Sequence, residues 1–169
     1  NKNIINSIIC NERNKTLEGK KVLITSGPTI EPIDPVRYIT NYSSGSQGYH
    51  ISECMHDFGA DVTFISGPTN LGVPRCKNFF QVQTADEMYN AIPNNINFDV
   101  AICVAAVSDW KFSKKFKNKI KKEDHNSLIL DFEKNIDILY QICNFKNRPQ
   151  LVIGFAAETQ NIFQNAKKK

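Results

Sequence analysis

The chain has 169 residues, of which 41% are hydrophobic and 22% are charged, and its formal net charge is +4. This length suits one compact α/β domain, and the longest apolar run, residues 100–107, is far shorter than the ~20 residues that span a bilayer, so we expect a cytoplasmic protein that makes no membrane contact. The five cysteines are widely spaced and include no CxxC pair, which argues against a disulfide framework and a zinc site.

The first third of the chain predicts one strand, one long loop and one helix. Residues 1–17 are polar and irregular, and we interpret them as a linker or the tail of a preceding domain, with one domain over residues 18–169. Residues 21–26 form a β-branched run that ends at a Gly-Pro pair, which is typical of a buried strand that enters a turn. Apolar residues then recur at helical spacing over 51–58 and predict a helix over 44–59.

Strands and helices alternate from there to the end of the sequence. The predicted strands cover residues 61–66, 79–83, 100–105 and 151–155, and a short apolar run lies at 128–130. The predicted helices follow Thr84, cover residues 136–143 and begin at Glu158. The run at 100–105 is apolar on both faces and therefore belongs in the middle of a parallel sheet. This order predicts an α/β fold with a doubly wound, mostly parallel, Rossmann-like sheet and helices on both faces.

A polar turn in front of the first predicted helix suggests an anion site. Asn41, Ser43, Ser44 and Gly45 stand where the helix begins, and free backbone N–H groups at a helix start bind phosphate. Ligands of such sheets bind beyond the carboxyl ends of the strands, so we expect this long loop to be functional. The alternative is that a serine only caps the helix and that Gly48 only permits close packing.

An acidic residue and a lysine-rich stretch follow the central strand. Asp109 lies at the predicted strand tip, where it can hold a hydroxyl group or a magnesium ion, or else cap a turn. Residues 111–122 contain seven lysines and no acidic residue, which leaves the rest of the chain net negative. We therefore expect no nucleic-acid partner, and a flexible loop that closes over a polyphosphate. A solvated surface is the alternative interpretation of the lysines.

This sequence lacks the motifs of two other classes of nucleotide-binding protein. An NAD-dependent oxidoreductase needs a tight glycine fingerprint after the first strand and an acidic residue at the end of the second. In this sequence Gly27 is followed by Pro28, and the second strand runs into Ser66-Gly67-Pro68. The sequence GxxxxGK[ST] of Walker-type ATPases is also absent, so neither class is favoured.

Seven short motifs occur in order along residues 18–169. They are Gly27-Pro28-Thr29 with Glu31-Pro32; the run Ile33-Asp34-Pro35-Val36-Arg37-Tyr38; Asn41 with Ser43-Ser44-Gly45 and Gly48; Ala105-Ala106-Val107 with Asp109-Trp110; Lys119-Ile120-Lys121-Lys122; Asn135 with Asp137-Ile138; and Gly154-Phe155-Ala156-Ala157-Glu158-Thr159. Together they resemble the phosphopantothenate–cysteine ligase family, the synthetase half of the bifunctional bacterial coenzyme A biosynthesis protein. The segment GPTIEPIDPVR is similar to the bacterial type, which uses CTP.

The resemblance implies a ligation in two steps. The carboxylate of 4′-phosphopantothenate attacks the α-phosphate of CTP to give an acyl-cytidylate and pyrophosphate, and the amine of L-cysteine then displaces CMP. A carboxylate must be activated in this way because it is a poor acyl donor, and cations and backbone donors stabilise the charge that develops on phosphorus. The resemblance further implies Mg²⁺, a homodimer, and FMN only where a phosphopantothenoylcysteine decarboxylase domain is fused upstream.

The resemblance also implies roles for single residues. Asn41 would hold the acyl-nucleotide intermediate, and Lys119 would meet the nucleotide phosphates from a mobile lid. The substrate-binding residues that it implies are Arg37, Asn41, Ser43, Ser44, Gly45 and Ala106, with Arg37 also near a subunit interface. The nucleotide contacts that it implies are Gly27, Pro28, Thr29, Cys103, Val104, Ala105, Asp109, Lys119, Asn135, Ile136, Asp137, Ile138, Leu139, Phe155 and Lys169. It identifies no metal ligand.

The sequence departs from the family pattern at three places. Ser46-Gln47 replaces the usual Lys-Met between two glycines, Ile136 replaces a proline, and Lys111 stands where arginine is common. The first change removes a cation from beside the expected phosphate site. We also expect the chain to be truncated at its C-terminus, and a nucleotide- or phosphate-binding domain without catalysis is therefore the alternative function.

Overall fold

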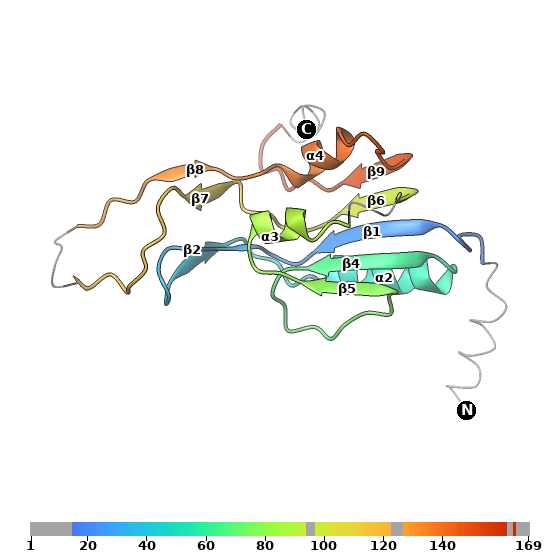
Figure 1. Ribbon diagram of the computed structural model, residues 1–169, viewed down its shortest axis with the longest axis horizontal. Helices are drawn as coiled ribbons and strands as arrows, with labels where there is room; N and C mark the ends of the chain where they lie inside the picture. The colour runs from blue at the N-terminus through green and yellow to red at the C-terminus, as the bar shows by residue number, and fades with distance from the viewer. Residues whose placement is uncertain (1–14, 94–96, 123–126, 162–163, 165–169) are drawn as a thin grey trace.

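A five-stranded parallel sheet forms the centre of the computed structural model, which describes residues 15–93, 97–122, 127–161 and 164 (Figure 1). From edge to edge its strands are β5 (Asn78–Gln81), β4 (Asp61–Ser66), β1 (Lys21–Ser26), β6 (Val100–Cys103) and β9 (Leu151–Gly154). The chain moves outward from β1 through β4 to β5 and then returns to the other side of β1 at β6. The predicted doubly wound α/β fold is therefore confirmed.

Helices cover both faces of this sheet. α2 (Ser46–Asp57) lies on one face, and α3 (Ala85–Asn90) and α4 (Ile138–Cys143) lie on the other (Figure 1). Successive side chains of a strand point to opposite faces. Accordingly, Val22 of β1 packs in the apolar cluster below α2, and Leu23 packs in the cluster that α3 and α4 cover.

Two antiparallel ribbons extend beyond the carboxyl ends of the parallel strands (Figure 1). The first pairs β2 (Ile30–Pro32) with β3 (Tyr38–Thr40), and the second pairs β7 (Trp110–Phe112) with β8 (Phe132–Lys134). Phe112 is buried and packs on Phe132, with 4.5 Å between the ring centroids. We call residues 113–122, which leave β7 at the far end of the second ribbon, the lysine segment.

The ribbons are the main difference from the sequence-based expectation. The loop expected after the first strand contains a hairpin, and the last ribbon strand lies at 132–134 rather than in the apolar run at 128–130. Such three-residue strands carry too few residues to show a period in the sequence. The strands β5 and β6 also end two residues earlier than predicted and β9 ends one residue earlier, whereas α4 begins two residues later, at Ile138.

Some expectations concern parts of the chain that the structure covers only in part. Residues 158–161 are not helical, which contradicts a helix that begins at Glu158, and most of the following residues lie outside the described part. The expected linker at 1–17 is described only from residue 15 onward. Within the described ranges, no helix has the length and apolar character needed to cross a bilayer.

Candidate functional site

The carboxyl ends of β1 and β6 continue side by side beyond the sheet. Pro28 and Ala106 form an isolated parallel bridge, and the N–H of Ala106 donates to the carbonyl of Gly27 at 2.9 Å. The buried Thr29 hydroxyl then accepts from the N–H of Ser108 at 2.9 Å. The chain reverses its direction across the sheet between these two strands, and ligands of doubly wound sheets bind at that point. Two of the predicted motifs therefore meet at the expected edge.

Asn41 is attached to this edge by its side chain. Its amide nitrogen donates to the carbonyl of Val107 at 3.0 Å and to that of Ala106 at 3.4 Å, although the residue is exposed. The amide that the resemblance assigns to the reaction intermediate thus binds backbone carbonyls in this structure. These bonds hold the polar turn over the segment that follows β6.

Gly45, not a serine, begins α2. It is the N-cap with φ of 74°, and no side chain within the described residues caps this helix. Ser43 and Ser44 accept instead from the N–H groups of Gly45 and Ser46, both at 3.3 Å. The alternative interpretation as a serine cap is therefore wrong.

Two glycines let the polar turn and the start of α2 lie close to their neighbours, Gly45 beside Thr69 and Gly48 beside β1. A Cβ atom on Gly45 would lie 2.7 Å from Cγ2 of Thr69, and one on Gly48 would overlap the side chain of Ser26. The hydroxyl of Ser26 donates to the carbonyl of Gly45 at 3.1 Å. The expectation that Gly48 permits close packing is confirmed.

A buried carboxylate connects three segments at the same edge. Glu31 is 1% exposed, and its Oε1 accepts from the N–H of Ala85 at the start of α3 and from the side-chain amide of Asn135, at 3.0 and 2.9 Å. The N–H of Asn135 donates to the carbonyl of Asp109 at 2.8 Å. Two predicted nucleotide contacts, Asp109 and Asn135, are therefore neighbours, while the side chain of Asp109 is exposed.

The segment that follows Asn135 has structural contacts of its own. Asp137 caps α4 by accepting from the N–H of Tyr140 at 2.9 Å, and Ile138 is buried in the core. Leu139 packs against Gly154, where an added Cβ atom would lie 2.6 Å from Cδ2 of the leucine. Ile136 contacts the same core cluster as Ile138, so apolar side chains occupy both positions around the predicted contact at Asp137.

The end of β6 offers backbone rather than side-chain groups. Burial raises the pKa of the Cys103 thiol to about 11, so this side chain is a neutral thiol at physiological pH. Its carbonyl accepts from the N–H of Phe155 at 3.3 Å, which brings Phe155, half exposed, beside Val104 and Ala105. Lys169, the last predicted nucleotide contact, lies outside the described residues.

The lysine segment is attached to the turn of the first ribbon. Asp34 is buried, and its carboxylate accepts from the guanidinium of Arg37 and from the N–H of Ile120. Burial alone would raise the pKa of Asp34, but the N–H groups of Val36, Ile120 and Arg37 and the guanidinium lower it to about 2. Lys119, beside Ile120, is exposed.

Lys111 has a different position from the other lysines. Its Nζ lies 2.9 Å from Asp86 of α3 and 3.9 Å from Glu133 of β8, and its side chain is only 21% exposed. The hydrogen bond to Asp86 is the main reason why the pKa of Lys111 is raised. This lysine therefore connects β7 to α3 and belongs to the base of the second ribbon.

The sequence alone assigns no separate role to two residues that hold the site together. Glu31 and Asp34 belong to the motifs of the family resemblance, but nothing in a sequence shows that a carboxylate is buried. The spacing of Asp34 and Arg37, three residues apart within a turn, was the one available signal of an ion pair. Within the described ranges, no cluster of three or more His, Cys, Asp and Glu side chains is arranged to hold a metal ion.

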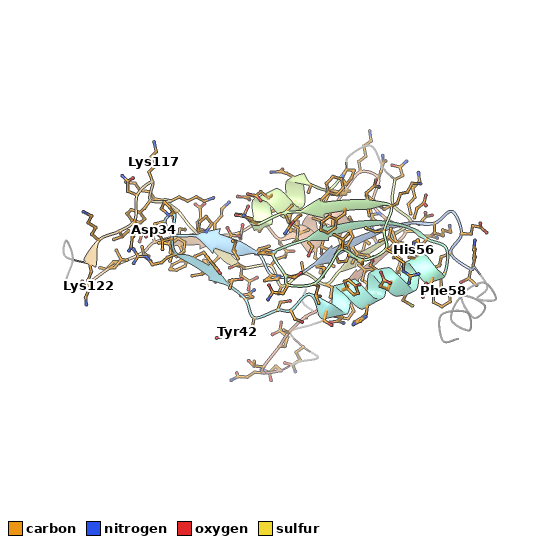
Figure 2. All side chains as sticks on the ribbon, turned by 90° about the horizontal axis from the view of Figure 1, so that it is seen from below. Asp34, Tyr42, His56, Phe58, Lys117 and Lys122 are labelled. Carbon is orange, nitrogen blue, oxygen red and sulfur yellow. The ribbon has the colours of Figure 1, made fainter. Side chains whose placement is uncertain are left out.

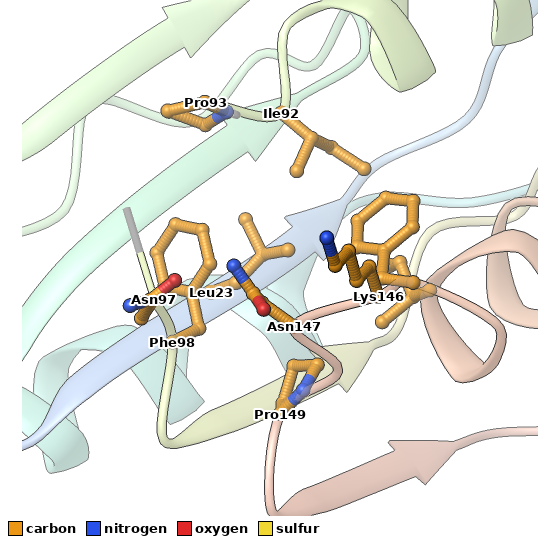
Figure 3. A pocket seen from close by; sticks show the side chains of 10 residues that line it. Leu23, Ile92, Pro93, Asn97, Phe98, Lys146, Asn147 and Pro149 are labelled. Atoms are coloured by element: carbon orange, nitrogen blue, oxygen red, sulfur yellow. The ribbon is translucent and has the colours of Figure 1, made fainter. Parts of the chain in front are cut away.

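Two of the cavities formed by the described residues flank the sheet. One of about 130 Å³ lies beside the polar turn, with Ser26, Gly45 and Thr69 in its wall. The other, of about 230 Å³, lies near the amino ends of β6 and β9, between Ile92, Phe98 and Phe145, with Lys146 at its side (Figure 3). The predicted site residues lie at the opposite edge of the sheet, so the larger cavity is separate from the candidate site.

The chain is similar to a known protein family over most of its length. Residues 17–169 match the family model of the DNA/pantothenate metabolism flavoprotein C-terminal domain. The coenzyme A biosynthesis bifunctional proteins CoaBC of Vibrio parahaemolyticus and Borreliella burgdorferi are 41% and 42% identical to this chain, over 92% and 100% of it. The chain spans 39% and 44% of the length of these two relatives.

Solved structures agree with this result. The crystal structure of the C-terminal domain of CoaBC matches with a TM-score of 0.77 and 41% identity, over 92% of this chain and 73% of that one. A Cab2 mutant in complex with phosphopantothenate-cysteine matches with a TM-score of 0.59 over 99% of this chain and 72% of that one, and at 17% identity it shows the shared fold. On this evidence, the chain belongs to the family of the DNA/pantothenate metabolism flavoprotein C-terminal domain.

Proposed function

We propose that this chain, over residues 18–169, is a phosphopantothenate–cysteine ligase domain that uses CTP. The observation that carries the proposal is the edge between β1 and β6, where Gly27, Asn41 and Ala106 lie together in a family whose members take part in coenzyme A biosynthesis. A carboxylate oxygen of 4′-phosphopantothenate attacks the α-phosphorus of CTP, and the bond to the leaving pyrophosphate breaks. The amine of L-cysteine then attacks the acyl carbon, the bond to CMP breaks, and the amine loses a proton.

The residues at this edge have chemistry that suits each step. Backbone N–H groups at the start of α2, next to Ser43, Ser44 and Gly45, attract phosphate. The small side chain of Ala106 lets the acyl group approach the backbone. Asn41 holds the polar turn against the segment that contains Ala106. Lys119 supplies positive charge to the phosphates of CTP from the lysine segment.

The nucleotide would lie along the segments that close the edge on the β6 side. Phe155, beside the backbone of Cys103, Val104 and Ala105, offers an aromatic face to a base. The other proposed nucleotide contacts are Gly27, Pro28, Thr29, Asp109, Asn135, Ile136, Asp137, Ile138, Leu139 and Lys169. Since Ile138 is buried, its part is confined to its backbone.

The residues at this edge could bind Mg²⁺ together with the phosphates of the substrate. Mg²⁺ is commonly held by one or two carboxylates together with substrate phosphates, and Asp109 is an exposed carboxylate at the edge. We assign Asp109 as the residue that would hold the ion, which would neutralise charge on the polyphosphate when bound.

The proposal extends to partners. The relatives are named as bifunctional proteins, and we propose that this domain works beside an FMN-dependent decarboxylase domain that consumes its product. We further propose that it acts as a homodimer, with Arg37 of the first ribbon near the subunit interface.

Pyrophosphate release by the full-length protein tests the function. With 4′-phosphopantothenate present, CTP should support release far faster than ATP, and L-cysteine should be required for amide formation. Equal rates with both nucleotides would contradict the choice of CTP. Binding of CTP without release of pyrophosphate would favour the alternative of a non-catalytic nucleotide-binding domain.

The variant Asn41→Asp tests, in the same assay, whether Asn41 takes part in the reaction. A carboxylate there faces the carbonyls of Ala106 and Val107 and an anionic intermediate, so amide formation should fall by roughly 100-fold, as on loss of a well-placed donor. Pyrophosphate release in a single turnover should fall less. The exposed Asn70→Asp serves as the control, and equal activity of both variants would contradict the role of Asn41.

A further inference from the structure

The two oxygens of the Asp34 carboxylate have separate partners. Oδ1 accepts from the backbone N–H groups of Val36 and Arg37, at 2.8 and 2.9 Å, and so closes the turn between β2 and β3. Oδ2 accepts from Nε and Nη2 of Arg37, at 3.0 and 2.7 Å, and from the N–H of Ile120 at 3.1 Å. One oxygen therefore organises the turn, and the other reaches across to the lysine segment.

Ile120 is held at both of its backbone groups. Its carbonyl accepts from Nη2 of Arg37 at 2.6 Å, while its N–H donates to Asp34. A third bond, from the N–H of Phe116 to the carbonyl of Ile33 at 2.9 Å, fixes the same stretch four residues earlier. Figure 2 shows Asp34 at the end of the protruding ribbons, with Lys117 and Lys122 around it. The lysine segment is thus attached to the turn of the first ribbon at both Phe116 and Ile120.

We infer that Asp34 is a positioning residue, which holds the lysine segment through Ile120 and thereby places Lys119 for its work on the nucleotide. Lys119 directly precedes the residue held at both backbone groups, so its Cα position is set by those bonds. Burial raises the pKa of Asp34, but the hydrogen bonds from its partners lower it to about 2, so the carboxylate is ionised at neutral pH and can accept from all of them. The role at Lys119 rests on the proposed function, whereas the contact between Asp34 and the lysine segment does not.

Asp34→Asn is the informative substitution because it affects the two oxygens differently. An asparagine that keeps its oxygen at the Oδ1 position still closes the turn. Its NH₂ group would then face the guanidinium of Arg37 and the N–H of Ile120, and both of these are donors. Asp99→Asn is the matched control, since Asp99 also accepts from a backbone N–H and a lysine, those of Lys21 and Lys20, near the start of β1.

Limited trypsin digestion of the full-length protein tests the contact without any substrate. Cleavage after Lys117, Lys119 and Lys121, mapped by mass spectrometry, should become on the order of tenfold faster in Asp34→Asn and stay unchanged in Asp99→Asn. Thermal unfolding of each variant shows whether the remaining domain is intact. If the domain is intact and cleavage of the lysine segment is as slow as in the wild type, the inference is wrong.

A double-mutant cycle tests whether Asp34 acts through Lys119. Single-turnover pyrophosphate release should fall on the order of ten- to a hundredfold in Asp34→Asn, as misplacement of a positioned group predicts. In the Lys119→Ala background the same substitution should add less than about twofold, because its target is already absent. Fully multiplicative losses would overturn the inference. If the wild type releases no pyrophosphate, the proposed function fails, and the trypsin result still decides the contact.

Discussion

At the scale of single residues, the candidate site is built mainly from backbone groups and small side chains. Ser26, Gly27, Gly45 and Gly48 bring β1 and the start of α2 into direct contact. A side chain larger than hydrogen at Gly48 would separate the two elements. The local sequence therefore provides close packing between β1 and α2 at this point, rather than charged side chains.

Gly48→Ala tests this close approach. In a helix interior, alanine normally stabilises relative to glycine by roughly 0.5–1 kcal/mol, but here the new Cβ would overlap the buried side chain of Ser26. We expect the free energy of unfolding to fall by about 1–3 kcal/mol, the usual cost of overpacking, as measured by urea denaturation. Gly72→Ala, whose new Cβ atom would have no neighbour within 4 Å, should change little. An unchanged stability of Gly48→Ala would contradict the packing argument.

At the scale of elements, the second ribbon separates two kinds of lysine. Lys111 at its base is paired with Asp86 and Glu133, whereas Lys114 and Lys119 in the lysine segment are exposed. The sequence shows them as members of one positive stretch. The tertiary contacts of Lys111 with α3 and β8, which are remote from it in the sequence, distinguish it from the other two.

Alanine variants at these lysines should have different effects. Lys111→Ala should lower the free energy of unfolding by about 0.3–1 kcal/mol, because its ion pairs are partly exposed. Lys119→Ala should slow pyrophosphate release on the order of ten- to a hundredfold at unchanged stability. Lys114→Ala should change neither quantity. Similar kinetic losses at Lys114 and Lys119 would mean that the lysine segment acts only as a diffuse positive field.

The sheet could be predicted well from the sequence, and the ribbons poorly. The central strands have long β-branched runs, such as residues 21–26 and 61–66, and their apolar pattern is set by burial in the sheet. The ribbon strands have three residues each and depend on partners remote in the sequence. The fold class predicted that Gly27 and Ala106 lie at the same edge of the sheet, but not that they are neighbours, and the burial of Glu31 and Asp34 depends on tertiary contacts that no local pattern encodes.

At the scale of the whole molecule, the position of β1 between β4 and β6 divides the fold into two parts that come from successive stretches of the chain. The buried side chains of the cluster below α2 come mainly from the first part (Val22, Ile24, Ala60, Val62 and Phe64), whereas the second part contributes Ile102, with Val100 and Val104 packed against it. The cluster on the other face needs Ala101 and residues of α4. The candidate site lies on the boundary, where the bridge between Pro28 and Ala106 joins both parts.

This division has a consequence for synthesis on the ribosome. β1, α2, β4 and β5 end at Gln81, so they can pair and pack before β6 has been translated, and domains generally begin to fold from the N-terminal side during translation. We expect a force profile with a translational arrest peptide to show a first peak when Gln81 has left the exit tunnel and a second after β9. The nascent protein would then contain a folded half of the sheet, and its candidate site would be incomplete until β6 pairs with β1. A single peak after β9 would show that the two parts fold together.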